Sequence, residues 1–294
     1  MNINLILPLS SAAYPLCMTL EKAKRLCCIS GLLGGLLMLT GDYLFYGAFT
    51  SGHDLNPIAI MRTRADWQLL LGGAVGPVAA MFYAVGMSIF FLTLKSVNYR
   101  LAAFASLALA AMVLVGGAYH AVFTMYGFVG RVGNQIEREL LTGNVRTLYN
   151  WLAWMSYACG NLGTLTVLTL GIRRESEFPK WLLPLLPTNL VVLCFLLTPA
   201  FESLPAPLGG LIRGGRINGS FVLFFALATW AFWSSGENHA SAVVPIASGA
   251  AAKPVIGADD VSRGFHPRDL RGCCVVCAAA QFSRFVKTLH LPAM

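Results

Sequence analysis

Three ionisable side chains lie within or at the end of long apolar runs, where a charge is costly and therefore a candidate for chemistry. They are Asp42, His120 and Glu202. A carboxylate paired with an imidazole could relay a proton, because small changes in environment move histidine across its charge transition near physiological pH. Tyrosines flank the first two residues, and we count them among the candidates for ligand or proton binding: Tyr43, Tyr46 and Tyr119.

Each candidate also has a purely structural interpretation. Asp42 and Glu202 lie near the ends of their runs and could simply reach water at the lipid headgroups. His120 lies about two turns inside its run, where a neutral imidazole could bond to a backbone carbonyl or a tyrosine. Asn161, near the middle of another run, could bridge two helices or line a cavity.

Metal and nucleophile chemistry find little support in the residue spacing. The five histidines include no pair at i, i+3 or i+4, so no helical metal site is predicted. The cysteines at 273, 274 and 277 have a metal-like spacing but no second cluster. The nucleophile elbow and the glycine-rich phosphate loops are absent too. We therefore predict no cofactor and no metal, and leave catalytic roles unassigned.

The elements that must position these residues are membrane-spanning helices. Only 12% of the 294 residues are charged and 56% are hydrophobic, whereas soluble domains are about 25% charged. About 20 apolar residues cross the hydrocarbon core as a helix, and six runs reach that length. We predict an all-α bundle of six spans, at about Leu26–Phe49, Trp67–Leu94, Leu101–Val129, Trp151–Ile172, Trp181–Phe201 and Ile217–Trp233.

The connections and ends of the chain complete this prediction. The link Arg131–Asn150 has the pattern of a short surface helix, and Pro184 and Pro187 predict kinks in the fifth run. Residues 1–25 form an N-terminal extension, in which Met18 is an alternative start. Residues 26–233 form the transmembrane domain, and residues 234–294 form a flexible or disordered tail.

Alternation of the spans places the candidate residues on one side of the membrane. Runs one, three and five cross in the same direction, so their C-terminal ends, with Asp42, His120 and Glu202, share a depth. The longer loops, which carry Arg62 and Arg64, open on that side, and Asn218 begins the sixth run there. The sequence therefore predicts a polar chamber capped by these loops.

The net charge of +8 is explained by topology rather than by nucleic acid. The basic residues form short clusters between apolar runs, which is typical of chains that contact membrane lipids. The N-terminus and short loops hold eight Lys and Arg and the longer loops seven, and the tail adds six. We predict that both termini are cytoplasmic and that nucleic acid is not a partner. The oligomeric state is left open.

Five short motifs carry a resemblance to known proteins: Gly41-Asp42-Tyr43, Met61-Arg62, Arg64, Gly72-Gly73-x-x-Gly76 and Tyr119-His120. In these residues the chain resembles uncharacterised multi-pass bacterial membrane proteins of a domain-of-unknown-function type. The resemblance covers about Leu26–Trp233 and implies a location in the bacterial inner membrane. It implies no activity.

Three functions fit the pattern. In the leading one, the chamber on the non-cytoplasmic side binds or transports a small molecule or lipid. Asp42 and His120 then exchange a proton there, and Arg62 and Arg64 steer an anionic ligand. In the second, Asp42 and His120 are the general acid and base of a membrane-embedded enzyme acting on a lipid or isoprenoid. In the third, the polar residues only lock helices together in a structural subunit.

Overall fold

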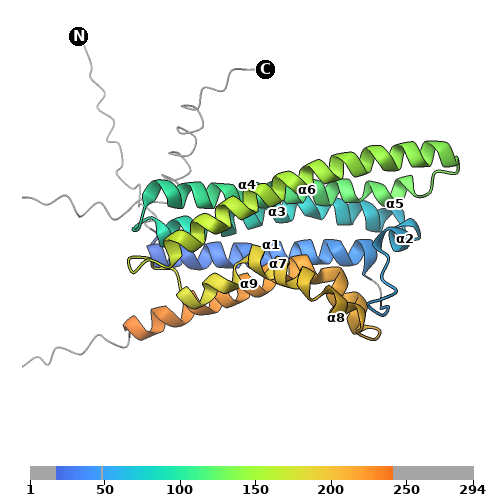
Figure 1. Cartoon of the computed structure of the whole chain (residues 1–294). Coiled ribbons are helices and arrows are strands. Elements are labelled where there is room, and N and C mark those ends of the chain that lie inside the picture. Colours follow the sequence, from blue (N-terminus) through green and yellow to red (C-terminus); the bar gives the residue numbers. More distant parts are fainter. Residues whose placement is uncertain (1–17, 48, 241–294) are drawn as a thin grey trace, which may run out of the picture. The chain divides into compact units, whose positions relative to one another are not determined.

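The regular secondary structure of residues 18–47 and 49–240, which the computed structural model describes, is entirely helical (Figure 1). The all-α prediction is confirmed for this part of the chain, and most of the predicted extension and tail lies outside it. One 3-10 helix, η1 (Lys180–Leu185), lies between α6 and α7. The α-helices are α1 (Leu20–Tyr46), α2 (Pro57–Arg62), α3 (Asp66–Leu94), α4 (Tyr99–Phe123), α5 (Met125–Val129), α6 (Gln135–Gly171), α7 (Pro187–Leu196), α8 (Thr198–Glu202) and α9 (Leu208–Ala240).

Four stretches of helix among the described residues are long and apolar enough to cross a membrane by length and composition. They correspond to the first, second, third and sixth predicted runs. Helix extends beyond both predicted domain boundaries, since α1 begins at Leu20 and α9 continues to Ala240. The four stretches are Leu20–Tyr46, Asp66–Leu94, Tyr99–Val129 and Leu208–Ser234.

The fourth predicted run and the surface helix predicted before it form one continuous helix, α6. The Asn134 side chain caps its first turn by accepting from the backbone N–H of Ile136 at 3.0 Å. The predicted boundary near Asn150 is wrong because no proline interrupts the 37 residues of the helix. At about 1.5 Å per residue, α6 is about 55 Å long and exceeds the thickness of a hydrocarbon core, about 30 Å.

The fifth predicted run is not one helix. It is divided into η1, α7 and α8, with Pro187 and Pro199 in the first turns of the two α-helices. A proline lacks the N–H that would continue the preceding helix, so the prediction of a single span is wrong here. The Asn189 side chain donates to the Leu183 carbonyl oxygen at 3.2 Å, which satisfies one acceptor at the break between η1 and α7.

This broken segment nevertheless runs along the length of α9. At its start, the Trp181 ring lies 5.8 Å from that of Trp230, near the C-terminal end of α9. At its end, Glu202 forms an ion pair of 2.8 Å with Arg213, in the second turn of α9. Figure 1 shows α7 and α8 following α9 in the opposite direction.

Close helix packing around α3 depends on glycine. Within the compact unit Lys24–Ala242, α3 packs on α4 and α4 packs on α6. A Cβ atom on Gly117 would lie 2.6 Å from the Ala80 Cβ and 2.9 Å from the Gly76 carbonyl oxygen. Only a residue without a side chain allows α3 and α4 to approach this closely.

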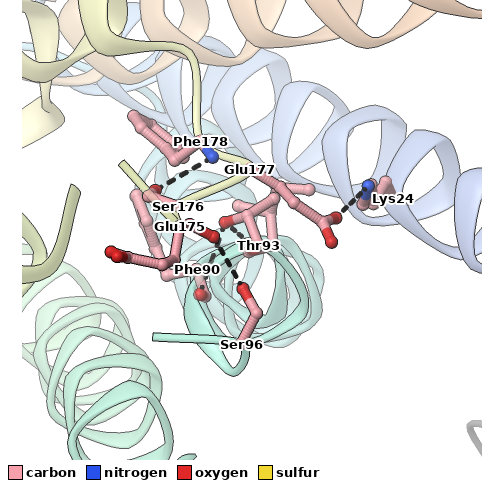
Figure 2. A network of polar contacts seen from close by, with 9 residues as sticks. Lys24, Phe90, Thr93, Ser96, Glu175, Ser176, Glu177 and Phe178 are labelled. Atoms are coloured by element: carbon pink, nitrogen blue, oxygen red, sulfur yellow. Dashed lines mark hydrogen bonds and ion pairs between the residues drawn. The ribbon is translucent and has the colours of Figure 1, made fainter. Parts of the chain in front are cut away.

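A polar cluster fastens the loop after α6 to two other helices (Figure 2). The Glu177 carboxylate pairs with Lys24 of α1 at 2.8 Å, and the Glu177 N–H donates to the Thr93 carbonyl oxygen at 3.1 Å. The Ser96 hydroxyl donates to the Glu175 carbonyl oxygen at 3.0 Å. Next to it, Phe178 is buried against Phe90 of α3, with ring centroids 5.6 Å apart.

Candidate functional site

The Asp42 carboxylate is the centre of a buried polar cluster near the C-terminal end of α1. Only 4% of Asp42 is exposed. The Tyr46 hydroxyl, one turn further along α1, donates to its Oδ1 at 3.0 Å. The Asn218 amide of α9 donates to Oδ2 at 2.7 Å. Both carboxylate oxygens are thus engaged, as a buried carboxylate requires.

His120 of α4 faces this carboxylate with one ring nitrogen. Its Nδ1 lies 3.7 Å from Asp42 Oδ1, and its Nε2 lies 3.2 Å from the Gly72 carbonyl oxygen of α3. A carbonyl oxygen only accepts, so the hydrogen bond to Gly72 requires the proton on Nε2. In neutral His120, Nδ1 is then an acceptor that faces an acceptor oxygen. At 3.7 Å the two atoms form no direct hydrogen bond. A proton on Nδ1 or on the carboxyl group removes the conflict between the two acceptors, so the geometry makes Asp42 and His120 a candidate pair for proton exchange.

Small residues allow the imidazole to reach this position. A Cβ atom on Gly41 would lie 2.8 Å from His120 Nε2, and one on Gly76 would lie 2.8 Å from His120 Cδ2. The opposite side of the ring is occupied by Phe45, which stacks on it at 4.8 Å between centroids. The imidazole is therefore held in one orientation between α1, α3 and α4.

The Asp42 cluster forms part of the wall of a cavity of about 810 Å³. This volume is within the range of small-molecule sites, about 300–1,000 Å³. Residues of α1, α2, α3, α4, α6, α7 and α9 line the cavity, and much of the lining is apolar. Its polar lining residues are Asp42, Tyr46, Tyr83, Tyr119, His120, Tyr149, Ser156, Tyr157, Asn161, Thr188, Arg213, Arg216 and Asn218.

The tyrosines of this lining differ in whether their hydroxyls are hydrogen-bonded. The hydroxyls of Tyr119 and Tyr149 are 2.8 Å apart and join α4 to α6. The Tyr83 side chain is 2% exposed, and its hydroxyl has no hydrogen-bond partner among the described residues. A buried hydroxyl without a partner is costly, so Tyr83 has capacity for a hydrogen bond to a molecule in the cavity.

The structure places Asp42, Tyr46, Tyr119, His120 and Asn161 of the predicted candidates around the one cavity. Asn161, predicted to lie within a span, is exposed at the side of α6, and among described residues its amide has no hydrogen bond. It is a lining residue rather than a bridge between helices.

The other predicted candidates lie outside the cavity lining of the described chain. Tyr43 points away and its hydroxyl donates to the Leu211 carbonyl oxygen at 3.2 Å. Glu202 is engaged by Arg213. Arg64 donates to the carbonyl oxygens of Phe45 and Gly47 and so caps the C-terminal end of α1. The exposed Arg62 side chain lies against Gly130.

Several lining residues were not predicted as site residues. Tyr83, Tyr149 and the two arginines of α9 had no distinguishing motif, and Arg213 and Arg216 entered only the count of basic residues. Alternation of the spans did place Asn218 on the side of Asp42. A buried hydrogen bond from Asn218 could be found only once α9 had been placed against α1.

Metal binding finds no structural support in the described residues, where no group of three or more His, Cys, Asp or Glu side chains could hold an ion. The cysteines at 273, 274 and 277 lie outside the described part of the chain.

The family comparison agrees with the region that forms the bundle. DUF6796, a family of unknown function, matches residues 3–234. The chain belongs to this family. Its matched region contains every described residue that lines the cavity, and the family assignment brings no activity with it. No curated protein and no solved structure matches the chain.

Proposed function

We propose that this DUF6796 protein is a multi-pass membrane protein that binds a small molecule or lipid in the cavity beside Asp42. The observation that carries the proposal is a buried Asp42–His120 pair, 3.7 Å apart, in the wall of a cavity of about 810 Å³. A purely structural role would require the polar groups only to satisfy one another. The buried Tyr83 hydroxyl instead lies along the cavity without a partner among the described residues.

Six crossings are consistent with the path of the chain. The four long apolar stretches supply crossings one, two, three and six. α6 is long enough to be the fourth, and η1, α7 and α8 together would be the fifth, because they lie against α9 from Trp230 to Arg213. Interrupted helices are tolerated at membrane depth where they are covered by protein or line a cavity, and Thr188 and Phe195 of α7 line this one.

The proposed membrane is the bacterial inner membrane, with both termini on the cytoplasmic side. The support is the sequence resemblance and the distribution of basic residues between the loops. In this orientation the Asp42 cluster, near the end of the first crossing, lies toward the non-cytoplasmic side.

A cavity-filling substitution tests the proposed binding. A Cβ atom on Gly116 would meet nothing closer than the Ser156 hydroxyl at 3.8 Å, so Gly116→Leu can extend into the cavity without a backbone clash. Gly143→Leu is a matched control, because a Cβ atom there has open space and Gly143 is not among the described lining residues. Each protein is purified in a neutral detergent, and its co-purifying small molecules are identified by mass spectrometry.

We expect one compound to be enriched with the wild type and with Gly143→Leu, and to be lost from Gly116→Leu. The same compounds at the same ratio in all three proteins would refute the proposal.

A second candidate is a membrane-embedded enzyme acting on a lipid or isoprenoid. The pairing of Asp42 with His120 favours it, because both residues line the cavity and could exchange a proton with a bound molecule. The test is incubation of the protein with a total lipid extract and mass spectrometry of the products. Asp42→Asn and His120→Gln should abolish turnover. Tyr43→Phe should not, because the Tyr43 hydroxyl bonds outside the cavity. A wild-type protein that leaves every lipid unchanged would exclude this candidate.

A further inference from the structure

Arg216 is the cavity residue whose charge the described structure leaves uncompensated. Its guanidinium donates to the Thr198 hydroxyl at 3.0 Å and lies 4.9 Å from the centre of the Phe195 ring. No carboxylate of the described residues pairs with it. The neighbouring Arg213 differs, because Glu202 neutralises it at 2.8 Å.

The other ionisable groups of the lining do not offset this charge. The Asp42 carboxylate forms no ion pair with Arg216, because its oxygens accept from Tyr46 and Asn218 and face His120. The remaining titratable side chains of the lining are tyrosines, which are neutral at physiological pH. Of the two lining arginines that the structure describes, Arg216 is thus the one without a carboxylate partner, which favours an anionic group beside it in the cavity.

Away from Arg216, the cavity lining is largely apolar where it reaches the surface between α6 and α7. Three lining residues are also exposed at this surface: Trp154 (72%) and Tyr157 (45%) of α6, and Val192 (55%) of α7. In the proposed membrane these side chains face lipid, and the opening would admit an apolar chain from the bilayer. A molecule that satisfies both ends has a charged head and an apolar tail.

We propose that the cavity binds an amphiphile whose anionic headgroup, a carboxylate or a phosphate, pairs with Arg216 and whose apolar chain passes between α6 and α7. This inference rests on the proposed binding function and adds the chemical class of the ligand. Arginine suits the role because its planar donors match the oxygens of both headgroups.

The test compares probes of one chain length in native mass spectrometry of the protein in a neutral detergent. The probes are oleate, oleoyl lysophosphatidic acid and uncharged oleyl alcohol, with inorganic phosphate as a competitor without a chain. We expect oleate or the lysophosphatidic acid to bind the wild type at one site, at least tenfold more tightly than the alcohol. Loss of one charged hydrogen-bonded contact corresponds to about tenfold to a hundredfold in affinity.

Three variants connect this preference to Arg216. Arg216→Gln should lower the affinity for the anions to that for the alcohol, and Arg216→Lys should keep most of the preference because the charge remains. Arg100→Gln removes an exposed arginine at the start of α4, which is not among the described lining residues, and should change nothing.

The outcomes separate this inference from the proposed function. Equal affinity for the alcohol and the anions would overturn the anionic class of the ligand, and so would an unchanged preference for anions in Arg216→Gln. The cavity itself would still be supported if Gly116→Leu abolishes the binding. Binding of inorganic phosphate to the wild type without binding of any chain-bearing probe would overturn the amphiphile in favour of a free anion. Binding that persists in Gly116→Leu would refute the cavity itself.

Discussion

Replacing Asn218 by leucine removes the shorter of the two hydrogen bonds that the Asp42 carboxylate receives within the described structure. The Nδ2 to Oδ2 distance is 2.7 Å, and Asp42 is 4% exposed, so water does not readily replace the lost donor. A hydrogen bond to a charged group contributes about 1.5–3 kcal/mol. We therefore expect Asn218→Leu to lower the free energy of unfolding by about 2 kcal/mol.

The double variant tests the cause of this loss. Asp42→Leu removes the acceptor, so the Asn218 amide no longer has a buried carboxylate to which it can donate a hydrogen bond. The combined loss in Asp42→Leu/Asn218→Leu should therefore be smaller than the sum of the single losses, by about 1.5–3 kcal/mol. Unfolding is measured by titrating the protein in neutral micelles with dodecyl sulfate and following the helical circular dichroism.

Asn161→Leu is the matched control, because this exposed amide lines the same cavity and has no hydrogen bond within the described residues. We expect it to change stability by less than about 0.5 kcal/mol. If Asn218→Leu is no more destabilising than Asn161→Leu, or if the two losses at 42 and 218 simply add, the proposed network does not hold Asp42.

Three further predictions concern packing and topology. Gly117→Val should destabilise the protein by at least about 1–3 kcal/mol, seen as a lower thermal midpoint, because its Cβ atom would overlap Ala80. Glu177→Gln should cost no more than about 1 kcal/mol in the same assay, because the Glu177 side chain is 46% exposed and water screens its pair with Lys24. Alkaline phosphatase fused in the loop at residue 133 should be active outside the cytoplasm, whereas a fusion at residue 97 should be inactive; equal activity at both positions would contradict the proposed orientation.

The two sites at which the sequence prediction failed share a physical cause. Hydropathy measures whether a segment is apolar, and residues 181–201 are apolar throughout. It does not measure backbone continuity, which Pro187 and Pro199 interrupt to leave η1, α7 and α8. The boundary near Asn150 failed for the opposite reason. Polarity changes there, but nothing in the backbone chemistry of α6 ends the helix.

The arginines predicted to steer a ligand show the same difference between residue type and folded structure. Arg62 and Arg64 were expected in a loop after the first run, where an arginine could steer a ligand. In the structure Arg62 is the last residue of the short helix α2, and Arg64 follows it. The folded chain directs Arg64 to the carbonyl oxygens at the end of α1 instead. Those carbonyls have no partners within the helix, and only the folded loop brings a guanidinium to them.

The sequence by itself determined that the chain is helical and apolar, and it predicted that Asp42 and His120 lie toward the same end of the bundle. These properties depend on residue type and on the alternation of spans, which the order of the chain already contains. The tertiary structure decided that His120 Nδ1 faces Asp42 and that the Asn218 amide donates a hydrogen bond to the Asp42 carboxylate. It also decided that Arg216 lacks a carboxylate partner among the described residues. These contacts join helices up to 176 residues apart in the chain, and their geometry depends on how each helix is rotated about its axis. That rotation is set by close packing at glycines such as Gly41 and Gly76, which no local pattern of hydropathy specifies.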